Sequence, residues 1–169
     1  MTTILILSCG TRNKLVRFFK EAFHSLPGGG RVIVTDCSPW APALYEADAF
    51  YLVPPMKDPG YEDRILEICM REQVNALLPL FEDELDLLAQ NRKKFEEKGI
   101  TAIVSDAESV AVCRDKYGFF SLLQKNGVSL GVRGRKDCVP GICKACSGLW
   151  KRRYQPGGQP RASWCAVPL

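Results

Sequence analysis

Continuous apolar runs of four or five residues recur along the first 130 positions, as in strands buried on both faces of a sheet. Segments with apolar residues every three or four positions lie between these runs, which is the spacing of a helix with one buried face. This alternation predicts an α/β fold in which an about five-stranded parallel sheet lies between two helical layers. The five expected strands are 4–7, 31–34, 50–53, 76–80 and 101–104.

The first helix is expected to begin at Thr11, because threonine is a common N-cap residue. Asp58 followed by Pro59 predicts the start of another helix, with aspartate as the cap and proline in the first turn. A single long helix is expected from Phe81 to a stop at Gly99, and a further helix from about Asp115. The stripe expected to be buried on the first helix is Leu15, Phe18, Phe19, Ala22 and Leu26.

Polar residues follow several of the expected strands at their carboxyl ends, where parallel sheets bind ligands. Ser8–Arg12 follow the first strand, Asp36 the second and Glu82–Glu84 the fourth. The 8–12 segment lacks the G-x-G-x-x-G pattern of dinucleotide sites, which leaves a tight turn or a small-anion site assisted by Arg12. The acidic residues are either metal or acid–base groups or, as in many helices, stabilise the first turn of the helix.

Histidine and cysteine usage narrows the possible chemistry. His24 is the single histidine and is expected on the solvated side of the first helix, which excludes triad catalysis. The cysteines of the first part are expected to be reduced and buried, with Cys9 the most favoured as a thiolate. A later cluster with C-x4-C-x2-C spacing is the alternative, as a zinc or iron–sulfur site. These two sets are Cys9, Cys37, Cys69 and Cys113, and Cys138, Cys143, Cys146 and Cys165.

Charge divides the chain near Leu130. Residues 1–130 carry 15 basic and 18 acidic residues, whereas 131–169 carry 8 basic residues and one acidic residue, Asp137. We therefore expect a domain over 1–129 and a basic Gly/Pro/Cys-rich tail over 130–169 that is irregular or disordered, as a shifted reading frame would produce. The alternatives for this tail are a metal-binding or a nucleic-acid-binding module. The sequence shows no apolar run of membrane-spanning length and no secretory leader, which predicts a cytoplasmic protein.

The first part also resembles a known family. The resemblance lies in the order and spacing of five segments: 4–12, 30–38, 47–61, 77–85 and 113–128, the last containing Cys113-Arg114-Asp115-Lys116-Tyr117. Together they resemble the Rossmann-like, pre-ATP-grasp domain of ATP-grasp ligases related to the large subunit of carbamoyl-phosphate synthase. In such enzymes ATP and Mg²⁺ serve to phosphorylate a carboxylate, and an amine then attacks the acyl phosphate. The glycine-rich flap and the Mg²⁺ ligands of the family are not found in this sequence.

The resemblance also suggests roles for particular residues. It implies that an edge that binds the acceptor substrate or faces the catalytic domain is lined by Gly10, Arg12, Asp36 and Asp83. It also implies that Lys116 contacts ATP, although Lys116 suits an ordinary first-turn lysine as well. It assigns no catalytic residue and no metal ligand. We therefore expect the truncated front of an ATP-dependent ligase, inactive alone, with small-molecule partners and no specific nucleic acid or membrane. The alternative is a freestanding small-ligand binding domain, and the oligomeric state stays open.

Overall fold

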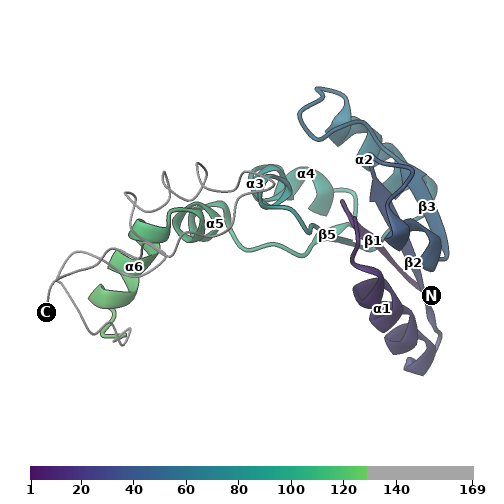
Figure 1. Ribbon diagram of the computed structural model, residues 1–169, viewed down its shortest axis with the longest axis horizontal. Helices are drawn as coiled ribbons and strands as arrows, with labels where there is room; N and C mark the ends of the chain where they lie inside the picture. Colours follow the sequence, from purple (N-terminus) through teal and green to yellow (C-terminus); the bar gives the residue numbers. More distant parts are fainter. Residues whose placement is uncertain (129–169) are drawn as a thin grey trace, which may run out of the picture. The chain divides into compact units, whose positions relative to one another are not determined.

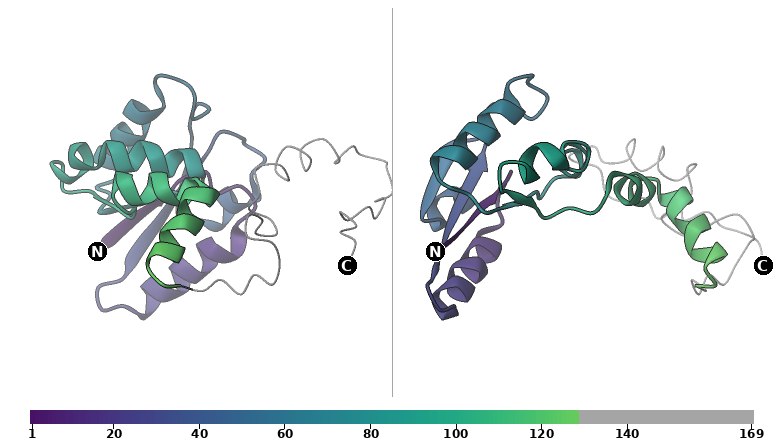
Figure 2. Two further views of the ribbon diagram at one scale, coloured as in Figure 1. Left: turned by 90° about the vertical axis from the view of Figure 1, so that its left-hand side faces the viewer. Right: turned by 180° about the vertical axis from the view of Figure 1, so that it is seen from behind.

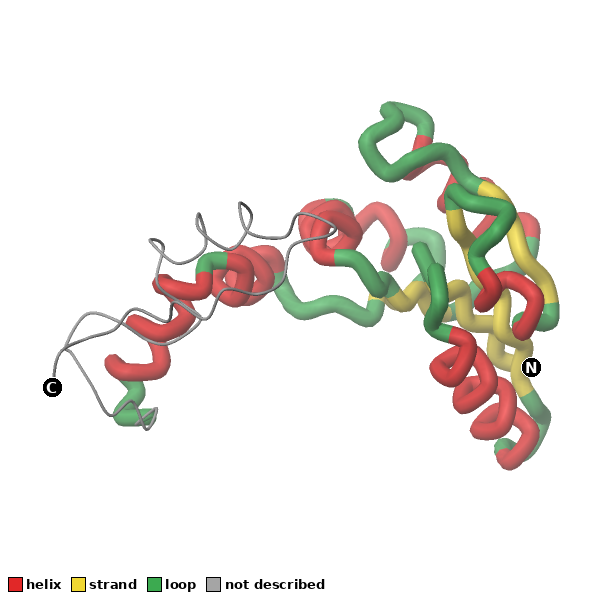
Figure 3. The backbone as a smooth tube through the Cα atoms, viewed as in Figure 1, coloured by secondary structure: helices red, strands yellow, loops and turns green. Residues whose placement is uncertain are grey.

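A five-stranded, all-parallel sheet forms the centre of the protein, as the sequence predicted. The computed structural model describes residues 1–128 (Figure 1), and strands alternate with helices from β1 to β5 (Figure 3). The strand order is β3-β2-β1-β4-β5, so the direction of winding reverses between β1 and β4. The strands are β1 (Thr2–Ile6), β2 (Gly30–Asp36), β3 (Ala49–Leu52), β4 (Ala76–Leu78) and β5 (Thr101–Ala102).

Helices cover both faces of this sheet (Figures 1 and 2). One face packs against α1 (Asn13–Ser25) and the 3₁₀ helix η1 (Pro42–Glu46). The other packs against α2 (Tyr61–Arg71), α3 (Glu82–Gln90) and α4 (Arg92–Glu96). The next helix, α5 (Ala107–Arg114), contacts α3 and ends the first compact unit, Met1–Arg114. A second unit begins at Asp115 and contains α6 (Lys116–Lys125).

The central strands β1 and β2 are buried on both faces, to which successive side chains point in turn. The end strand β3 is not, because Phe50 and Leu52 are exposed. In β1, Leu5 packs with α2, α3 and α4, while Ile4 and Ile6 pack with α1 and η1. No helix within residues 1–128 has the length and apolar character needed to cross a membrane.

The buried face of α1 differs from the predicted stripe. Val16, Phe19 and Phe23 pack against the sheet, whereas Phe18 is 62% exposed and Leu26 is 50% exposed. Both sets have helical spacing, so the pattern alone did not distinguish them. Polar contacts decide between the two sets. Arg17 and Lys20 on α1 bind Glu46 of η1, and Lys20 also binds Asp48 after it, which fixes the rotation of α1 about its axis. The helix also begins later than predicted, with Arg12 rather than Thr11 as its N-cap residue.

Two other helix predictions were wrong in detail. Asp58 does not cap a helix, because its carboxylate accepts a hydrogen bond from the Gly60 N–H at 2.8 Å, and α2 begins only at Tyr61. The long helix expected up to Gly99 is broken at Asn91 into α3 and α4. The Asn91 side chain donates to Glu62 at 3.2 Å and so ties the break to α2. The helix predicted near Asp115 is confirmed, since the Asp115 carboxylate accepts from the Tyr117 N–H and caps α6.

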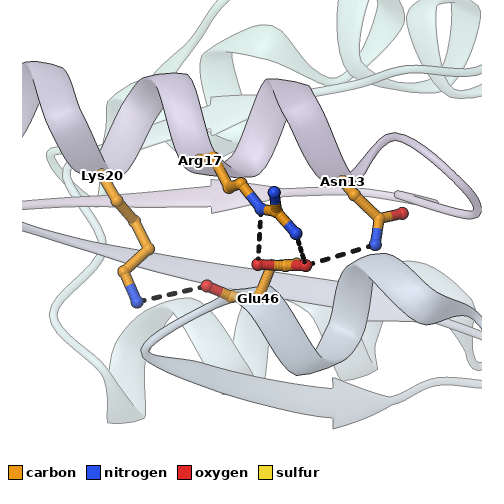
Figure 4. Close-up of polar contacts among 4 residues, drawn as sticks. All are labelled: Asn13, Arg17, Lys20 and Glu46. Carbon is orange, nitrogen blue, oxygen red and sulfur yellow. Dashed lines mark hydrogen bonds and ion pairs between the residues drawn. The ribbon is translucent and has the colours of Figure 1, made fainter.

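Glu46 joins α1 to η1 through four hydrogen bonds (Figure 4). Arg17 donates two of them to the carboxylate, at 2.8 and 2.5 Å, and Asn13 donates a third at 3.4 Å. The Lys20 ammonium donates to the Glu46 carbonyl oxygen at 3.2 Å and pairs with Asp48 at 2.8 Å. The hydrogen bonds from Arg17 lower the pKa of Glu46 to about 2.

Replacing Glu46 with glutamine is expected to lower the thermal midpoint at pH 7. Because the pKa of Glu46 falls from 4.5 to about 2 on folding, its stabilisation is complete above about pH 4.5 and is lost as the pH falls towards 2. The difference in thermal midpoint between wild type and Glu46→Gln should therefore shrink as the pH falls from about 4.5 towards 2. Calorimetry at several pH values measures this difference. Glu67→Gln, which removes one surface ion pair with Arg64, is the control. A difference that stays constant between pH 5 and 2.5 would contradict the assignment.

Candidate functional site

The turn Ser8–Arg12 lies at the carboxyl end of β1, where the winding direction of the sheet reverses. Ligands of doubly wound sheets bind in the crevice at this position. Two residues of the turn have a left-handed backbone, Ser8 with a φ of 43° and Gly10 with a φ of 51°. This conformation is disfavoured for serine, so the surrounding contacts must hold Ser8 in place.

The Asp36 carboxylate binds the inside of this turn. It accepts a hydrogen bond from the Gly10 N–H at 2.8 Å and another from the Ser38 N–H at 2.9 Å, and the residue is 8% exposed. The neighbouring Cys9 N–H donates to the Thr35 carbonyl oxygen. The protein's own carboxylate therefore takes the amide that an external anion would need, which favours the tight-turn interpretation of this segment.

The Arg12 side chain bridges the loops that follow β1 and β4. Its Nη1 donates to the Ser8 carbonyl oxygen at 3.3 Å, and its Nη2 donates to the Leu80 carbonyl oxygen at 3.4 Å. The residue is exposed, and its guanidinium binds no carboxylate among residues 1–128. Among residues 1–128, Arg12 thus presents a positive charge without a carboxylate partner at this edge of the sheet, where a planar guanidinium can bind a carboxylate or phosphate in a bidentate way.

Glu84 is one of the three consecutive acids that the sequence placed at this edge, and it is the one that is buried. Its side chain is fully buried, and one carboxylate oxygen accepts hydrogen bonds from the Ser8 and Tyr61 hydroxyls, each at 2.5 Å. Leu80 N–H donates to the other oxygen at 3.4 Å. The sequence spacing could have predicted the burial of Glu84. It stands four residues before the apolar Leu88, so both side chains lie on the same, buried face of α3.

The pKa values of two groups at this edge are shifted by their surroundings. Burial, together with the nearby Glu84 carboxylate, raises the pKa of the Tyr61 hydroxyl, which therefore remains a hydrogen-bond donor. Burial raises the pKa of Cys9 to about 11, with Asp36 adding to the effect. Cys9 is therefore the buried thiol that the sequence predicted, and the alternative of a reactive thiolate is contradicted because the thiol is buried and lies near a carboxylate.

The other cysteines of the first part divide into two kinds. Cys69 is buried, and its burial raises the pKa to about 12. Cys37 and Cys113 are exposed, contrary to the prediction that this set is buried. The cysteine cluster proposed as a metal or iron–sulfur site, Cys138 to Cys165, lies outside the described residues, as does the whole predicted tail. Within residues 1–128 no group of three histidine, cysteine or acidic side chains is arranged to hold a metal ion.

Asp83 takes no part in the Gly10–Asp36 contact. The Asp83 carboxylate pairs with Arg114 of α5 at 2.9 Å, and Arg114 also pairs with Asp86. Lys116 is the first residue of α6, is exposed, and belongs to the second unit. A pocket of about 290 Å³ lies beside the Arg114 ion pairs, lined by Asp86, Ala89, Gln90, Ala107, Ala111 and Arg114. The structure thus brings together Gly10, Arg12 and Asp36 of the predicted set.

The fold and this edge define a doubly wound α/β domain with polar side chains gathered at the reversal point of the sheet. Residues 4–103 match the family model described as "PylC-like, N-terminal domain". This match spans more than half of the chain, so the protein belongs to the PylC-like N-terminal domain family. Its α/β unit is a pre-ATP-grasp domain. No curated protein sequence matches the chain significantly.

Solved structures of larger enzymes contain the same fold. N5-carboxyaminoimidazole ribonucleotide synthetase from Thermotoga maritima is 22% identical over 75% of this chain, with a TM-score of 0.52. N5-carboxyaminoimidazole synthetase from Staphylococcus aureus complexed with ADP is 18% identical over 75%, with a TM-score of 0.51. The biotin carboxylase–ATP complex from Campylobacter jejuni is 18% identical over 75%, with a TM-score of 0.54. The present chain covers 31%, 30% and 28% of these three proteins, respectively.

Proposed function

We propose that the domain is the N-terminal portion of an ATP-dependent carboxylate–amine ligase of the ATP-grasp class, similar to the large subunit of carbamoyl-phosphate synthase. In this proposal Gly10, Arg12 and Asp36 belong to the acceptor-substrate edge, and Asp83 belongs to its outer margin. Lys116 contributes to the edge of the ATP site. The chain by itself performs no ATP turnover.

Arg12 carries this proposal. A ligase that activates a carboxylate needs a cationic group to bind and orient an anionic acceptor, and Arg12 supplies such a charge at this edge of the sheet. Asp36 and Glu84 act indirectly in this scheme, because Glu84 holds the start of the turn at Ser8 and Asp36 holds its middle at Gly10. A freestanding small-ligand binding domain, the alternative from the sequence, would use the same edge.

Residues 1–128 do not fit the task of holding Mg²⁺, since they contain no cluster of carboxylates suited to a metal ion. Lys116 can attract a phosphate group, but a lone lysine does not orient ATP for transfer. We therefore derive no step of phosphoryl transfer from this chain. When bound in a complete ligase, ATP and Mg²⁺ would supply the activated phosphoryl group.

Small anionic ligands are expected to bind the chain through Arg12. Titration with a panel of amino acids, dicarboxylates and phosphate esters, followed by protein NMR, should shift the resonances of the Ser8–Arg12 turn. Arg12→Gln should weaken that binding at least tenfold, because it removes the charge and keeps the polar side chain. Arg64→Gln on the surface of α2 is the matched control and should leave binding unchanged. Equal binding by wild type and Arg12→Gln, or no shift with any member of the panel, would contradict the proposal.

The same preparation incubated with ATP and Mg²⁺ should release no ADP above a protein-free blank, with or without the bound anion. ADP release that disappears in Lys116→Ala would show that the chain carries its own phosphoryl-transfer site. If the chain is instead a freestanding binding domain, Arg12 should still bind the anion, and ATP should not change the affinity of the chain for that anion. A change of that affinity on addition of ATP favours the ligase assignment.

A further inference from the structure

Within residues 1–128, no other strand pairs with the outer edge of β3. This strand is the end strand of the sheet (Figure 1), and its sequence, Ala49-Phe50-Tyr51-Leu52, contains no charged residue and no proline. Proteins usually protect an edge strand with lysine, proline or a bulge, because its free backbone groups can pair with another chain. Phe50 is 43% exposed and Leu52 is 47% exposed, so this edge also displays apolar side chains on one face.

Aromatic side chains extend this apolar surface beyond the strand. The Tyr45 ring lies 5.5 Å from the Phe50 ring, and the Tyr45 hydroxyl donates to the Pro39 carbonyl oxygen at 2.9 Å. Trp40, beside Pro39, is 86% exposed, and Tyr45 is 67% exposed. We call Trp40, Tyr45, Phe50 and Leu52 the β3 patch. Tyr45 is held by its contacts before any partner arrives, which lowers the entropy lost on binding.

The charged groups nearest in sequence to the patch are neutralised within the domain. The Glu46 carboxylate binds Arg17, and the Asp48 carboxylate binds Lys20 and the Val32 N–H. On the face that carries Phe50 and Leu52, a partner would therefore meet an apolar surface beside backbone groups. On the opposite face it would meet the Arg71 guanidinium, which lies 5.8 Å from the Tyr51 ring. A second copy of the same chain meets both requirements, since it brings an equal strand edge and an equal apolar patch.

We propose that the protein forms a symmetric dimer in which the β3 strands of two copies pair antiparallel, joining two five-stranded sheets into one of ten strands. A two-fold axis perpendicular to the sheet reverses the strand direction and keeps corresponding faces on the same side. With Tyr51 on that axis, Phe50 of each copy lies opposite Leu52 of the other, on the face that carries Tyr45. Tyr51 points to the opposite face, where its hydroxyl donates to Glu72.

The size of the patch sets the expected strength of the dimer. Its three aromatic side chains expose on the order of 400 Å² in each copy, taking roughly 200 Å² for a whole aromatic side chain. Leu52 and the strand edge add to this area, but the sum stays below the ~800 Å² per partner of a standard interface. The dimer is therefore weak, with a dissociation constant on the order of 100 µM.

Sedimentation of the full chain under reducing conditions, from about 5 µM to 1 mM, tests the proposal. The average mass should rise with concentration from one chain towards two. Phe50→Lys and Leu52→Lys should each raise the dissociation constant at least tenfold, because they place like charges across the axis. Phe18→Lys introduces the same charge at an exposed phenylalanine of α1 and should change the constant by less than twofold.

Circular dichroism establishes that each variant is folded, and Trp40→Lys, at a side chain that is 86% exposed, replaces any that is not. A mixed sample of labelled and unlabelled chains should give intermolecular NOEs between Phe50 and Leu52. A wild type that stays monomeric at 1 mM overturns the proposal. A dimer that is insensitive to all three patch variants, or one that lacks the Phe50–Leu52 NOE, overturns it as well.

Discussion

Replacement of Glu84 by leucine is expected to lower the free energy of unfolding by about 3 kcal/mol, since it leaves buried hydroxyl groups without their acceptor. The Tyr61 hydroxyl is enclosed with Glu84 and donates to it, and burial keeps that hydroxyl protonated. The Ser8 hydroxyl also loses its acceptor, and with it a contact that holds a left-handed serine. Urea denaturation measures the change.

Two further variants distinguish the contribution of the Glu84 carboxylate to stability from that of side-chain packing. Glu84→Gln retains one carbonyl oxygen in the same place and should cost about 1 kcal/mol. Asp83→Asn alters the adjacent, half-exposed carboxylate and should change stability by less than about 1 kcal/mol. In a double-mutant cycle, Tyr61→Phe should cost less in the Glu84→Leu background than in wild type. Additive effects, or equal losses for Glu84→Leu and Asp83→Asn, would show that Glu84 is not the centre of this network.

Replacement of Asp36 by alanine is expected to destabilise the protein by about 2 kcal/mol and to create an anion site at the same time. The variant leaves the Gly10 and Ser38 N–H groups without their carboxylate acceptor, near a cationic arginine. Phosphate or sulfate can then bind these amides, as such ions do at turns that expose backbone N–H groups. The thermal midpoint of Asp36→Ala should therefore rise with added phosphate, through binding to the folded state.

Sodium chloride at equal ionic strength is the control for a general salt effect. The wild type, which offers phosphate only the Arg12 charge, should show a smaller phosphate-dependent rise than Asp36→Ala. Asp48→Ala is the matched variant, because Asp48 also accepts from a backbone N–H, that of Val32, but does so away from the turn. A similar response to phosphate in Asp36→Ala and Asp48→Ala would show that the turn has no special affinity for anions.

The strands and their order of appearance could be predicted because each is a local apolar run bounded by polar residues. The face of α1 could not, because two apolar stripes one residue apart compete on the same helix, and Arg17, Lys20 and their acidic partners decide between them. Those partners lie 26 or more residues further along the chain. The break at Asn91 depends likewise on Glu62, a residue of another helix.

The candidate site was predictable as a region and not as a set of contacts. The rule that ligands meet the carboxyl ends of parallel strands led to Gly10, Arg12 and Asp36. Nothing local indicates that Asp36 binds the Gly10 amide, 26 residues away, or that Arg12 reaches Leu80. Helical spacing relates Glu84 to the buried Leu88. Because Glu82 and Asp83 are acidic as well, the sequence alone did not show which of the three acids points inward.

The Ser8–Glu84–Tyr61 network also bears on how the domain folds. Its hydrogen bonds join residues 76 and 23 positions apart, so they form only when β1, α2 and α3 have assembled together. Contacts of this kind are absent from a transition state built from neighbouring strand–helix units. Their loss in Glu84→Leu should then appear mainly as faster unfolding, with the folding rate little changed. A polar cluster at the ligand edge would in this way set how long the native state persists.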